Sequence, residues 1–386
     1  MKILVSAGEA SGDLYAAALV RALQARLPQP AEFFGCTGHR LRAAGVRTVV
    51  DAASLNVVGL VEVIRHIPRI KGEFNKLLAA AERERPDFAI LTDSPDFHLR
   101  LAPKLRALGI PVIYLIAPQV WAWRKGRIKT IRRVVNHLLC IFPFEEDFFL
   151  ASGVPATYIG HPLTRLVSPE TPRADFFARH KLPPDRPLLA LLPGSRPGEI
   201  ARHLPVVCEA ARILAPDGIS LVLATPKGAA ARMNLTTFAE PLRAASIQHI
   251  EGETWDAIAH ADAALAASGT VTIEAALLGT PLAAFYKVSP WSWWMGRFLV
   301  DVPFFSMVNL VAGRKVIPEL IQDACTGERL AAEARRLLAD GEARLAVQMG
   351  LQEVARKLST EEDPMDKAAE IVLKVIAHAD VLRSGQ

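Results

Sequence analysis

Short apolar runs alternate with longer amphipathic segments along most of this sequence, and this alternation constrains the fold more than any other feature. In the first half, the runs that predict strands lie at residues 2–6, 32–35, 46–50, 88–92, 111–116, 136–141 and 156–159. In the second half, they lie at residues 188–192, 219–224, 246–250, 263–267 and 281–285. Strands joined by helices in this way form a parallel sheet that is covered on both faces. The sequence therefore predicts an α/β fold with two doubly wound parallel-sheet domains.

The boundaries of these domains follow from composition. A chain of 386 residues is long enough for two cores. Residues 166–184 are rich in proline, threonine and charge, which predicts a linker. We therefore expect a first domain at residues 1–165 and a second at residues 185–340. Residues 341–386 are helical in pattern, and we expect them to pack back on the first domain or to exchange with a partner chain in a homodimer.

The cysteines and the apolar segments exclude several classes of protein. The four cysteines are far apart and form no C-x-x-C pair, which argues against a zinc site or a disulfide framework and fits a reducing compartment. No signal peptide and no transmembrane helix are predicted. The loop at residues 7–13 has neither the G-x-G-x-x-G spacing nor a Walker sequence, so neither NAD nor ATP binding is supported.

The charges are distributed unevenly between the two halves. Residues 1–165 carry 22 Lys and Arg against 14 Asp and Glu, whereas residues 166–386 carry 23 against 26. A basic first half favours an anionic partner, which could be nucleic acid, an anionic membrane surface or a phosphorylated substrate.

Residues 263–281 combine a short buried strand, the small-residue turn Ser268-Gly269-Thr270 and a helix. The unpaired N–H groups at the start of a helix, together with its dipole, suit an anion such as a phosphate. Glu274 lies one turn into the helix, where its carboxylate could hold a diol such as a ribose. The alternative is that Thr270 caps an ordinary helix and Glu274 complements its dipole.

In open α/β sheets, the chemistry lies beyond the carboxyl ends of the strands. Asp93 and Asp96 follow one predicted strand, and Gly194-Ser195-Arg196 follows the first strand of the second domain. If the two domains face each other, these loops line one cleft, with phosphate-binding donors on one side and carboxylates on the other. Such a cleft suits a nucleotide-sugar transferase.

Eight short motifs, in this order and at this spacing, resemble the lipid-A-disaccharide synthase family. They are GEASGD (8–13), TDSPDF (92–97), APQVWAWR (117–124), FPFE (142–145), GHP (160–162), LLPGSR (191–196), ASGT (267–270) and NLVAGR (309–314). The resemblance implies an inverting glycosyltransferase of the GT-B fold, which has two Rossmann-like domains.

The same resemblance implies the reaction and its partners. The family joins UDP-2,3-diacylglucosamine to 2,3-diacylglucosamine 1-phosphate (lipid X), which gives a β-1,6-linked tetraacyl disaccharide 1-phosphate and UDP. This step of lipid A biosynthesis takes place at the cytoplasmic face of the inner membrane. The resemblance implies no metal, no cofactor and no nucleic-acid partner.

Two residues are predicted to be catalytic. The resemblance implies that Asp93 is the general base, and a carboxylate at a strand end can take a proton from an attacking hydroxyl. It also implies that Arg196 is needed for activity, which fits stabilisation of a departing diphosphate. The alternatives are that Asp93 caps the following helix and that Arg196 is a surface arginine.

The remaining site residues are predicted to bind substrates. We expect Ser195, Arg196, Ser268, Gly269, Thr270 and Glu274 to bind the UDP part of the donor. We expect Glu9, Ser11, Asp96 and Asn309 to contact substrate, the last because the resemblance marks it as functionally important. Glu9 could instead brace its loop, and Asp96 could cap a helix. We expect His161 to be a hydrogen-bonded histidine between the domains.

Three segments suggest attachment to a membrane surface without spanning it. Residues 124–133 include six basic residues and follow Trp121 and Trp123, and aromatic rings beside cations suit a lipid headgroup region. A second tryptophan cluster lies at residues 291–295, and residues 57–67 could form an apolar wall for acyl chains. The alternatives are a solvated helix face and ordinary core packing.

Two other functions stay open from the residues alone. UDP-N-acetylglucosamine 2-epimerases share the fold and a similar strand–SG–helix–Glu pattern, but they need no lipid acceptor. A non-catalytic nucleotide-sugar-binding protein would keep the anion site without a base at the strand end.

Overall fold

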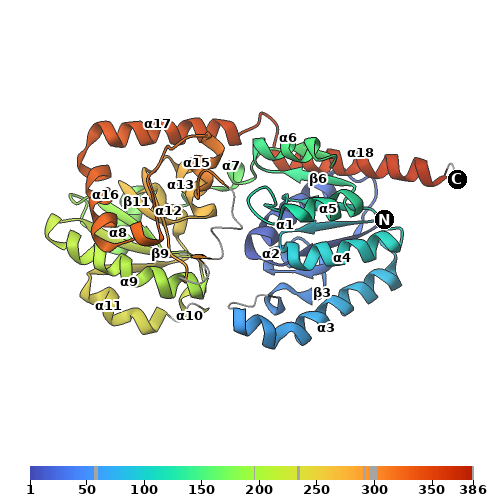
Figure 1. Cartoon of the computed structure of the whole chain (residues 1–386), viewed down its shortest axis with the longest axis horizontal. Coiled ribbons are helices and arrows are strands. Elements are labelled where there is room, and N and C mark those ends of the chain that lie inside the picture. The colour runs from blue at the N-terminus through green and yellow to red at the C-terminus, as the bar shows by residue number, and fades with distance from the viewer. Residues whose placement is uncertain (56–59, 195, 233–234, 290–292, 295–301, 385–386) are drawn as a thin grey trace. The chain divides into compact units, whose positions relative to one another are not determined.

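The computed structural model describes residues 1–55, 60–194, 196–232, 235–289, 293–294 and 302–384 (Figure 1). The chain divides into two compact units. Unit 1 contains residues 1–162 and 358–386, and unit 2 contains residues 163–357.

Unit 1 is built on a seven-stranded parallel sheet with the strand order β3-β2-β1-β4-β5-β6-β7. Its strands are β1 (Lys2–Ala7), β2 (Glu32–Thr37), β3 (Arg47–Asp51), β4 (Phe88–Thr92), β5 (Val112–Leu115), β6 (His137–Cys140) and β7 (Ala156–Tyr158). Its helices include α1 (Ala10–Arg26), α2 (His39–Ala43), α3 (Leu60–Glu84), α4 (Pro95–Ala107), α5 (Ile128–Val134), α6 (Pro143–Ala151) and α18 (Pro364–Ser384). The central strands β1 and β4 are apolar and almost wholly buried, as expected for a sheet covered on both faces.

Unit 2 is built on a six-stranded parallel sheet with the strand order β10-β9-β8-β11-β12-β13. Its strands are β8 (Leu188–Leu192), β9 (Ser220–Thr225), β10 (Ile247–Glu251), β11 (Ala263–Ala267), β12 (Leu282–Tyr286) and β13 (Glu319–Ile321). Its helices include α7 (Leu163–Leu166), α8 (Arg173–His180), α9 (Pro197–Leu214), α10 (Ala229–Arg232), α11 (Ala239–Ala244), α12 (Thr254–Ala259), α13 (Thr270–Leu278), α15 (Met307–Ala312), α16 (Gly327–Ala339) and α17 (Gly341–Leu358). The predicted class is confirmed: the chain has two parallel-sheet α/β units and a helical C-terminal region.

The structure differs from the sequence-based expectations in four elements. Helix α1 begins at Ala10, inside the segment expected to be a loop. Helix α3 continues through Pro68, although a proline inside a helix removes a backbone donor and would be expected to break it. Strand β13 was not predicted, because its three residues are too short a run to show a period. The expected linker at 166–184 carries α8, whose two phenylalanines are buried.

The C-terminal helices divide between the units. Helix α18 packs against α1 (Figure 1). An ion pair of 2.8 Å joins Arg26 and Asp366. The Nζ atom of Lys367 also donates to the carbonyl oxygen of Tyr158 at 2.8 Å. No helix within the described residues is long and apolar enough to cross a membrane.

Candidate active site

Asp93 is held by backbone N–H groups from the loop after β1. Ala7 pairs with Thr92, so the ends of β1 and β4 lie side by side and the residues that follow them meet. Oδ1 of Asp93 accepts the N–H of Gly8 at 2.9 Å, and Oδ2 accepts that of Glu9 at 3.1 Å. Because Glu9 is the N-cap of α1, the carboxylate lies at the start of that helix, where negative charge is favoured.

The pKa of Asp93 is raised to about 7 by burial. Hydrogen bonds from Gly8 and Ser94 oppose this shift, and the charge of Glu9 adds to it. A carboxylate with a pKa near neutrality suits general base catalysis. Asp93 does not cap α4, since Ser94 is the N-cap of that helix.

Gly8 and Gly12 leave room for the residues at the end of β4. A Cβ atom on Gly12 would lie 1.6 Å from Oδ2 of Asp93, and one on Gly8 would lie 2.3 Å from Oγ of Ser94. Both separations are far below any non-bonded contact. The glycines of the first motif are therefore required by the close approach of Asp93 and Ser94.

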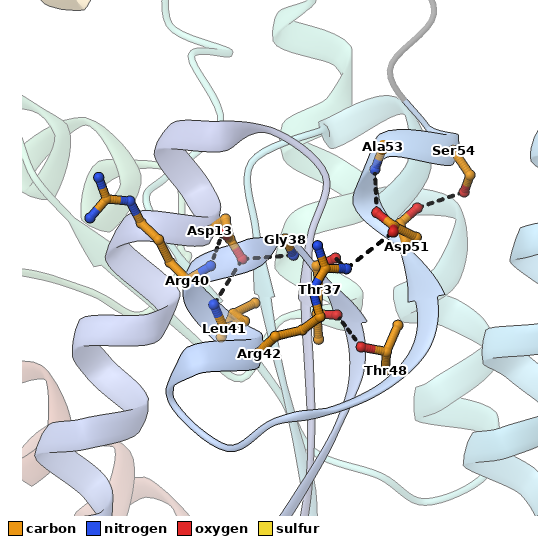
Figure 2. A network of polar contacts seen from close by, with 10 residues as sticks. All are labelled: Asp13, Thr37, Gly38, Arg40, Leu41, Arg42, Thr48, Asp51, Ala53 and Ser54. Carbon is orange, nitrogen blue, oxygen red and sulfur yellow. Dashed lines mark hydrogen bonds and ion pairs between the residues drawn. The ribbon is translucent and has the colours of Figure 1, made fainter. Parts of the chain in front are cut away.

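Asp13, the last residue of the same motif, has a structural role (Figure 2). Its carboxylate is buried and accepts N–H groups from Gly38 at 2.8 Å, Arg40 at 2.9 Å and Leu41 at 3.2 Å. These bonds satisfy free donors at the start of α2. Asp13 therefore fixes the turn between β2 and α2.

The other predicted substrate-binding residues of unit 1 are open to solvent to different degrees. Glu9 is half-buried, and Ser11 is exposed on the first turn of α1. The side chain of Asp96 is 62% exposed and forms ion pairs with Arg124, at 2.8 Å, and with Arg127. Asp96 thus belongs to a surface ion-pair cluster and is not the N-cap of α4.

The two tryptophans of the third motif have different surroundings. Trp121 is buried, and its Nε1–H donates to Oε1 of Glu145 at 3.0 Å. Trp123 is 37% exposed, and the guanidinium carbons of Arg124 and Arg127 lie 4.4 and 5.9 Å from its ring centroid. Of these two tryptophans, Trp123 is therefore the one whose ring lies beside cations at the surface.

His161 is fully buried within unit 1. Its ring contacts those of Tyr15 and Phe142, at centroid distances of 6.2 and 5.3 Å. Burial lowers its pKa to about 3, so the ring is neutral at physiological pH. These contacts fit a structural role.

In unit 2, the turn after β11 leads directly into α13. Gly269 is the N-cap of that helix and has no side chain with which to cap it. Thr270 is therefore not the cap residue, and it is instead the exposed first residue of the helix. The hydroxyl of Ser268 donates to the carbonyl oxygen of Phe305 at 2.7 Å. Ser268 therefore ties this turn to the segment before α15.

Glu274 is oriented by a tryptophan of the neighbouring helix α12. The Nε1–H group of Trp255 donates to Oε2 of Glu274 at 3.1 Å. Burial raises the pKa of Glu274, and this hydrogen bond opposes the shift. Because Trp255 bonds only one oxygen, the second can accept from a ligand hydroxyl.

The turn after β8 carries the predicted arginine. Ser195 lies outside the described residues. Arg196 is the N-cap of α9, its side chain is 60% exposed, and its Nη1 lies 3.9 Å from Oε1 of Glu199. The hydroxyl of Tyr286 donates to the same oxygen at 3.1 Å. The buried His203, on α9, holds the start of this turn, since its Nδ1 lies 2.7 Å from the carbonyl oxygen of Pro193.

Asn309 is fully buried, and its amide is bonded within the protein. Its Nδ2 donates to the carbonyl oxygen of Ile317 at 3.0 Å and to Oε1 of Glu319 at 2.8 Å. Its Oδ1 accepts the N–H groups of Val316 at 2.7 Å and Ile317 at 3.0 Å. Glu319 also accepts from Ser306. These contacts assign Asn309 to bracing the loops around α15 and leave it no free group for substrate.

Several residues that shape the site were missed by reasoning from the sequence. They are His98, Tyr114, His203, Trp255 and Glu319. Each lies within an apolar or helical segment and has no local sequence signal of its own. Only the structure could therefore identify these residues.

Comparisons with known proteins agree with this architecture. A family model described as lipid-A-disaccharide synthetase matches residues 3–374. A lipid-A-disaccharide synthase of Solibacter usitatus (strain Ellin6076) is 58% identical over 376 residues, which is 97% of each chain. One of Myxococcus xanthus (strain DK1622) is 46% identical over 377 residues, again 97% of each chain.

Solved structures with low identity share the fold. A UDP-GlcNAc 2-epimerase from Neisseria meningitidis, bound to UDP-GlcNAc, has a TM-score of 0.63 at 12% identity and covers 98% of this chain and 100% of that one. A glycosyltransferase from Rickettsia africae ESF-5 has a TM-score of 0.60 at 11% identity, with coverages of 97% and 98%. At such identities the likeness concerns the fold alone.

Proposed function

Because the chain belongs to the lipid-A-disaccharide synthase family, whose members are glycosyltransferases of lipid A biosynthesis, we propose that it condenses UDP-2,3-diacylglucosamine with lipid X. The products are the β-1,6-linked tetraacyl disaccharide 1-phosphate and UDP. Family membership also separates this function from that of the epimerases, which share only the fold.

Asp93 is the general base of this reaction. The observation that supports it is a carboxylate at a strand end, with a pKa of about 7 and both oxygens oriented by backbone N–H groups. Asp93 takes the proton of the acceptor hydroxyl while the acceptor oxygen bonds to the anomeric carbon of the donor. The bond from that carbon to the diphosphate oxygen breaks on the opposite face, so the configuration inverts.

Unit 2 binds the UDP part of the donor. The backbone N–H groups at the start of α13 face the diphosphate, and the oxygen of Glu274 that Trp255 does not bond accepts from the ribose. Arg196 stabilises the charge that develops on the departing UDP. The support is the N-terminal position of Gly269 and Thr270 on α13 and the orientation of Glu274 by Trp255.

The enzyme works at an anionic membrane surface on the cytoplasmic face of the inner membrane. The basic helix α5 and the exposed ring of Trp123 support this proposal. Lys125, Lys129, Arg132 and Arg133 are exposed on and just before α5, whereas Ile131 is buried. Clusters of this kind bind anionic headgroups.

Incubating the protein with both substrates tests the reaction. Mass spectrometry should detect the disaccharide and UDP in equal amounts, and no product when lipid X is left out. Loss of the UDP-sugar without lipid X would favour an isomerase, and no turnover would favour a binding protein. Asp93→Asn should abolish turnover, whereas Asp147→Asn on the exposed side of α6 should not change it.

A further inference from the structure

Two consecutive residues with a left-handed backbone follow β4. Asp93 has a φ of 57° and Ser94 a φ of 37°. For residues other than glycine, this conformation is strained and persists only when the surroundings impose it. Hydrogen bonds to Gly8 and Glu9 fix the carboxylate of Asp93, but something else must fix its main chain.

Two buried side chains hold the carbonyl group of Asp93 by hydrogen bonds. The hydroxyl of Tyr114, on β5, donates to this carbonyl oxygen. Nδ1 of His98, on α4, lies 2.9 Å from the same oxygen. Tyr114 and His98 are fully buried, so no water competes for these bonds.

The tautomer of His98 follows from its partners. A carbonyl oxygen can only accept, so Nδ1 carries the proton and Nε2 has the lone pair. Nε2 lies 2.7 Å from Oγ of Ser6, on β1, which must therefore donate to it. Burial lowers the pKa of His98 to about 4, which keeps the ring neutral and preserves this direction of donation.

We infer that His98 and Tyr114, with Ser6 behind His98, are positioning residues that hold the main chain of Asp93 so that its carboxylate faces the acceptor hydroxyl. The inference rests on the proposed role of Asp93 as the base. Bonds from α4 and β5 fix the carbonyl side of the residue, and Ser6 of β1 orients His98. The loop before α1 fixes the carboxylate side. Rotation of the peptide at Asp93 would break bonds on both sides and move the base.

His98→Leu tests the inference, because it removes the donor and keeps an apolar side chain. A base displaced by about 1 Å costs roughly 100-fold in rate. We expect kcat to fall about 100-fold with the KM of both substrates nearly unchanged, since a general fold defect would alter KM as well. His98→Asn can donate from a similar position and should restore most of kcat.

Two further variants complete the test. Tyr114→Phe removes one hydroxyl and should lower kcat by about 3- to 10-fold. If His98→Leu fails to fold, this variant alone tests the positioning role. His137→Leu is the matched control, since His137 is a half-buried histidine at the amino end of β6 that pairs with Thr157. It should keep kcat.

The outcomes separate this inference from the proposed function. Normal kcat in Tyr114→Phe and in folded His98→Leu, with an inactive Asp93→Asn, would overturn the positioning role alone. An active Asp93→Asn would overturn the role of Asp93 as base, and with it the reason for positioning that residue.

Discussion

At the scale of single residues, the environment of Asp93 predicts how activity depends on pH. The base works as a carboxylate, so kcat should rise with pH through about 7 and level off above it. A profile of kcat between pH 5 and 9 checks this. A rate that stays flat across this range in the wild-type protein would contradict it.

The same pKa predicts an effect on stability. Because the pKa of Asp93 in the folded state is above its ordinary value of 3.8, folding favours the protonated form. This contribution to stability is complete below about pH 4 and is lost as the pH rises through about 7. The Tm of the wild-type protein relative to Asp93→Asn should therefore be lower at pH 8 than at pH 5. A difference that does not vary with pH would show that the carboxyl titrates normally.

The glycines of the first motif give a second prediction at this scale. In Gly12→Ala, the added methyl group would occupy the position of the Asp93 carboxylate, so we expect kcat to fall at least about 100-fold. Gly72→Ala is the matched control, since Gly72 also lies in a helix and has nothing within 4 Å of an added Cβ. Equal activity of the two variants would mean that Asp93 can move aside without loss.

At the scale of elements, the proposed nucleotide site depends on α12 and α13, which the bond from Trp255 to Glu274 joins. Glu274→Ala should weaken UDP binding at least about 10-fold, because it removes an acceptor for a ribose hydroxyl. Trp255→Phe leaves the carboxylate but removes the donor that orients it, so the loss should be smaller. Isothermal titration with UDP measures both, and Glu342→Ala on α17 serves as the exposed control. Unchanged affinity in Glu274→Ala would leave this glutamate with a structural role only.

The loop after α15 depends on a buried amide, that of Asn309. Asn309→Ala leaves buried partners without bonds on Ile317, Val316 and Glu319, which should lower the free energy of unfolding by roughly 2–4 kcal/mol. Urea denaturation measures this change. Asn75→Ala, at an exposed position of α3, should change stability by less than about 0.5 kcal/mol. A fully stable Asn309→Ala that loses only substrate affinity would argue for a direct contact instead.

At the scale of the whole molecule, the excess of positive charge in the first half predicts binding to membranes. The wild-type protein should float with anionic vesicles at low salt and be released by about 0.5 M NaCl, where the Debye length is only a few ångströms. Lys125→Glu with Lys129→Glu should abolish flotation, whereas Arg243→Glu with Arg329→Glu in unit 2 should not. Binding that resists salt, or none at all, would contradict an electrostatic attachment.

The sequence suggested that residues 57–67 form an apolar wall for acyl chains and that the tryptophan cluster at 291–295 faces a membrane, with core packing as the alternative for both. The side chains at 57–67 and residues 291, 292 and 295 lie outside the described part of the chain. Of that tryptophan cluster, Trp294 is 57% exposed, and the ring of Trp293 lies 6.0 Å from that of Phe305.

The sequence by itself determined the two parallel sheets, the strand ends at which polar residues gather, and the family. These features depend on local patterns: apolar runs set the strands, and short motifs in a fixed order mark the family. Asp93 and Glu274 could be chosen because carboxylates at such positions are unusual against an apolar background.

Only the tertiary structure decided how these residues are held. The register of β1 against β4 brings Gly8 and Gly12 next to Asp93, although about 80 residues of sequence separate them. No local sequence pattern encodes a contact between residues so far apart in the chain. Burial raises the pKa of Asp93 and makes the buried amide of Asn309 a brace, although the motifs suggested a substrate contact. Burial and long-range hydrogen bonds are properties of the packed chain, and so they appear only once the strands and helices have come together.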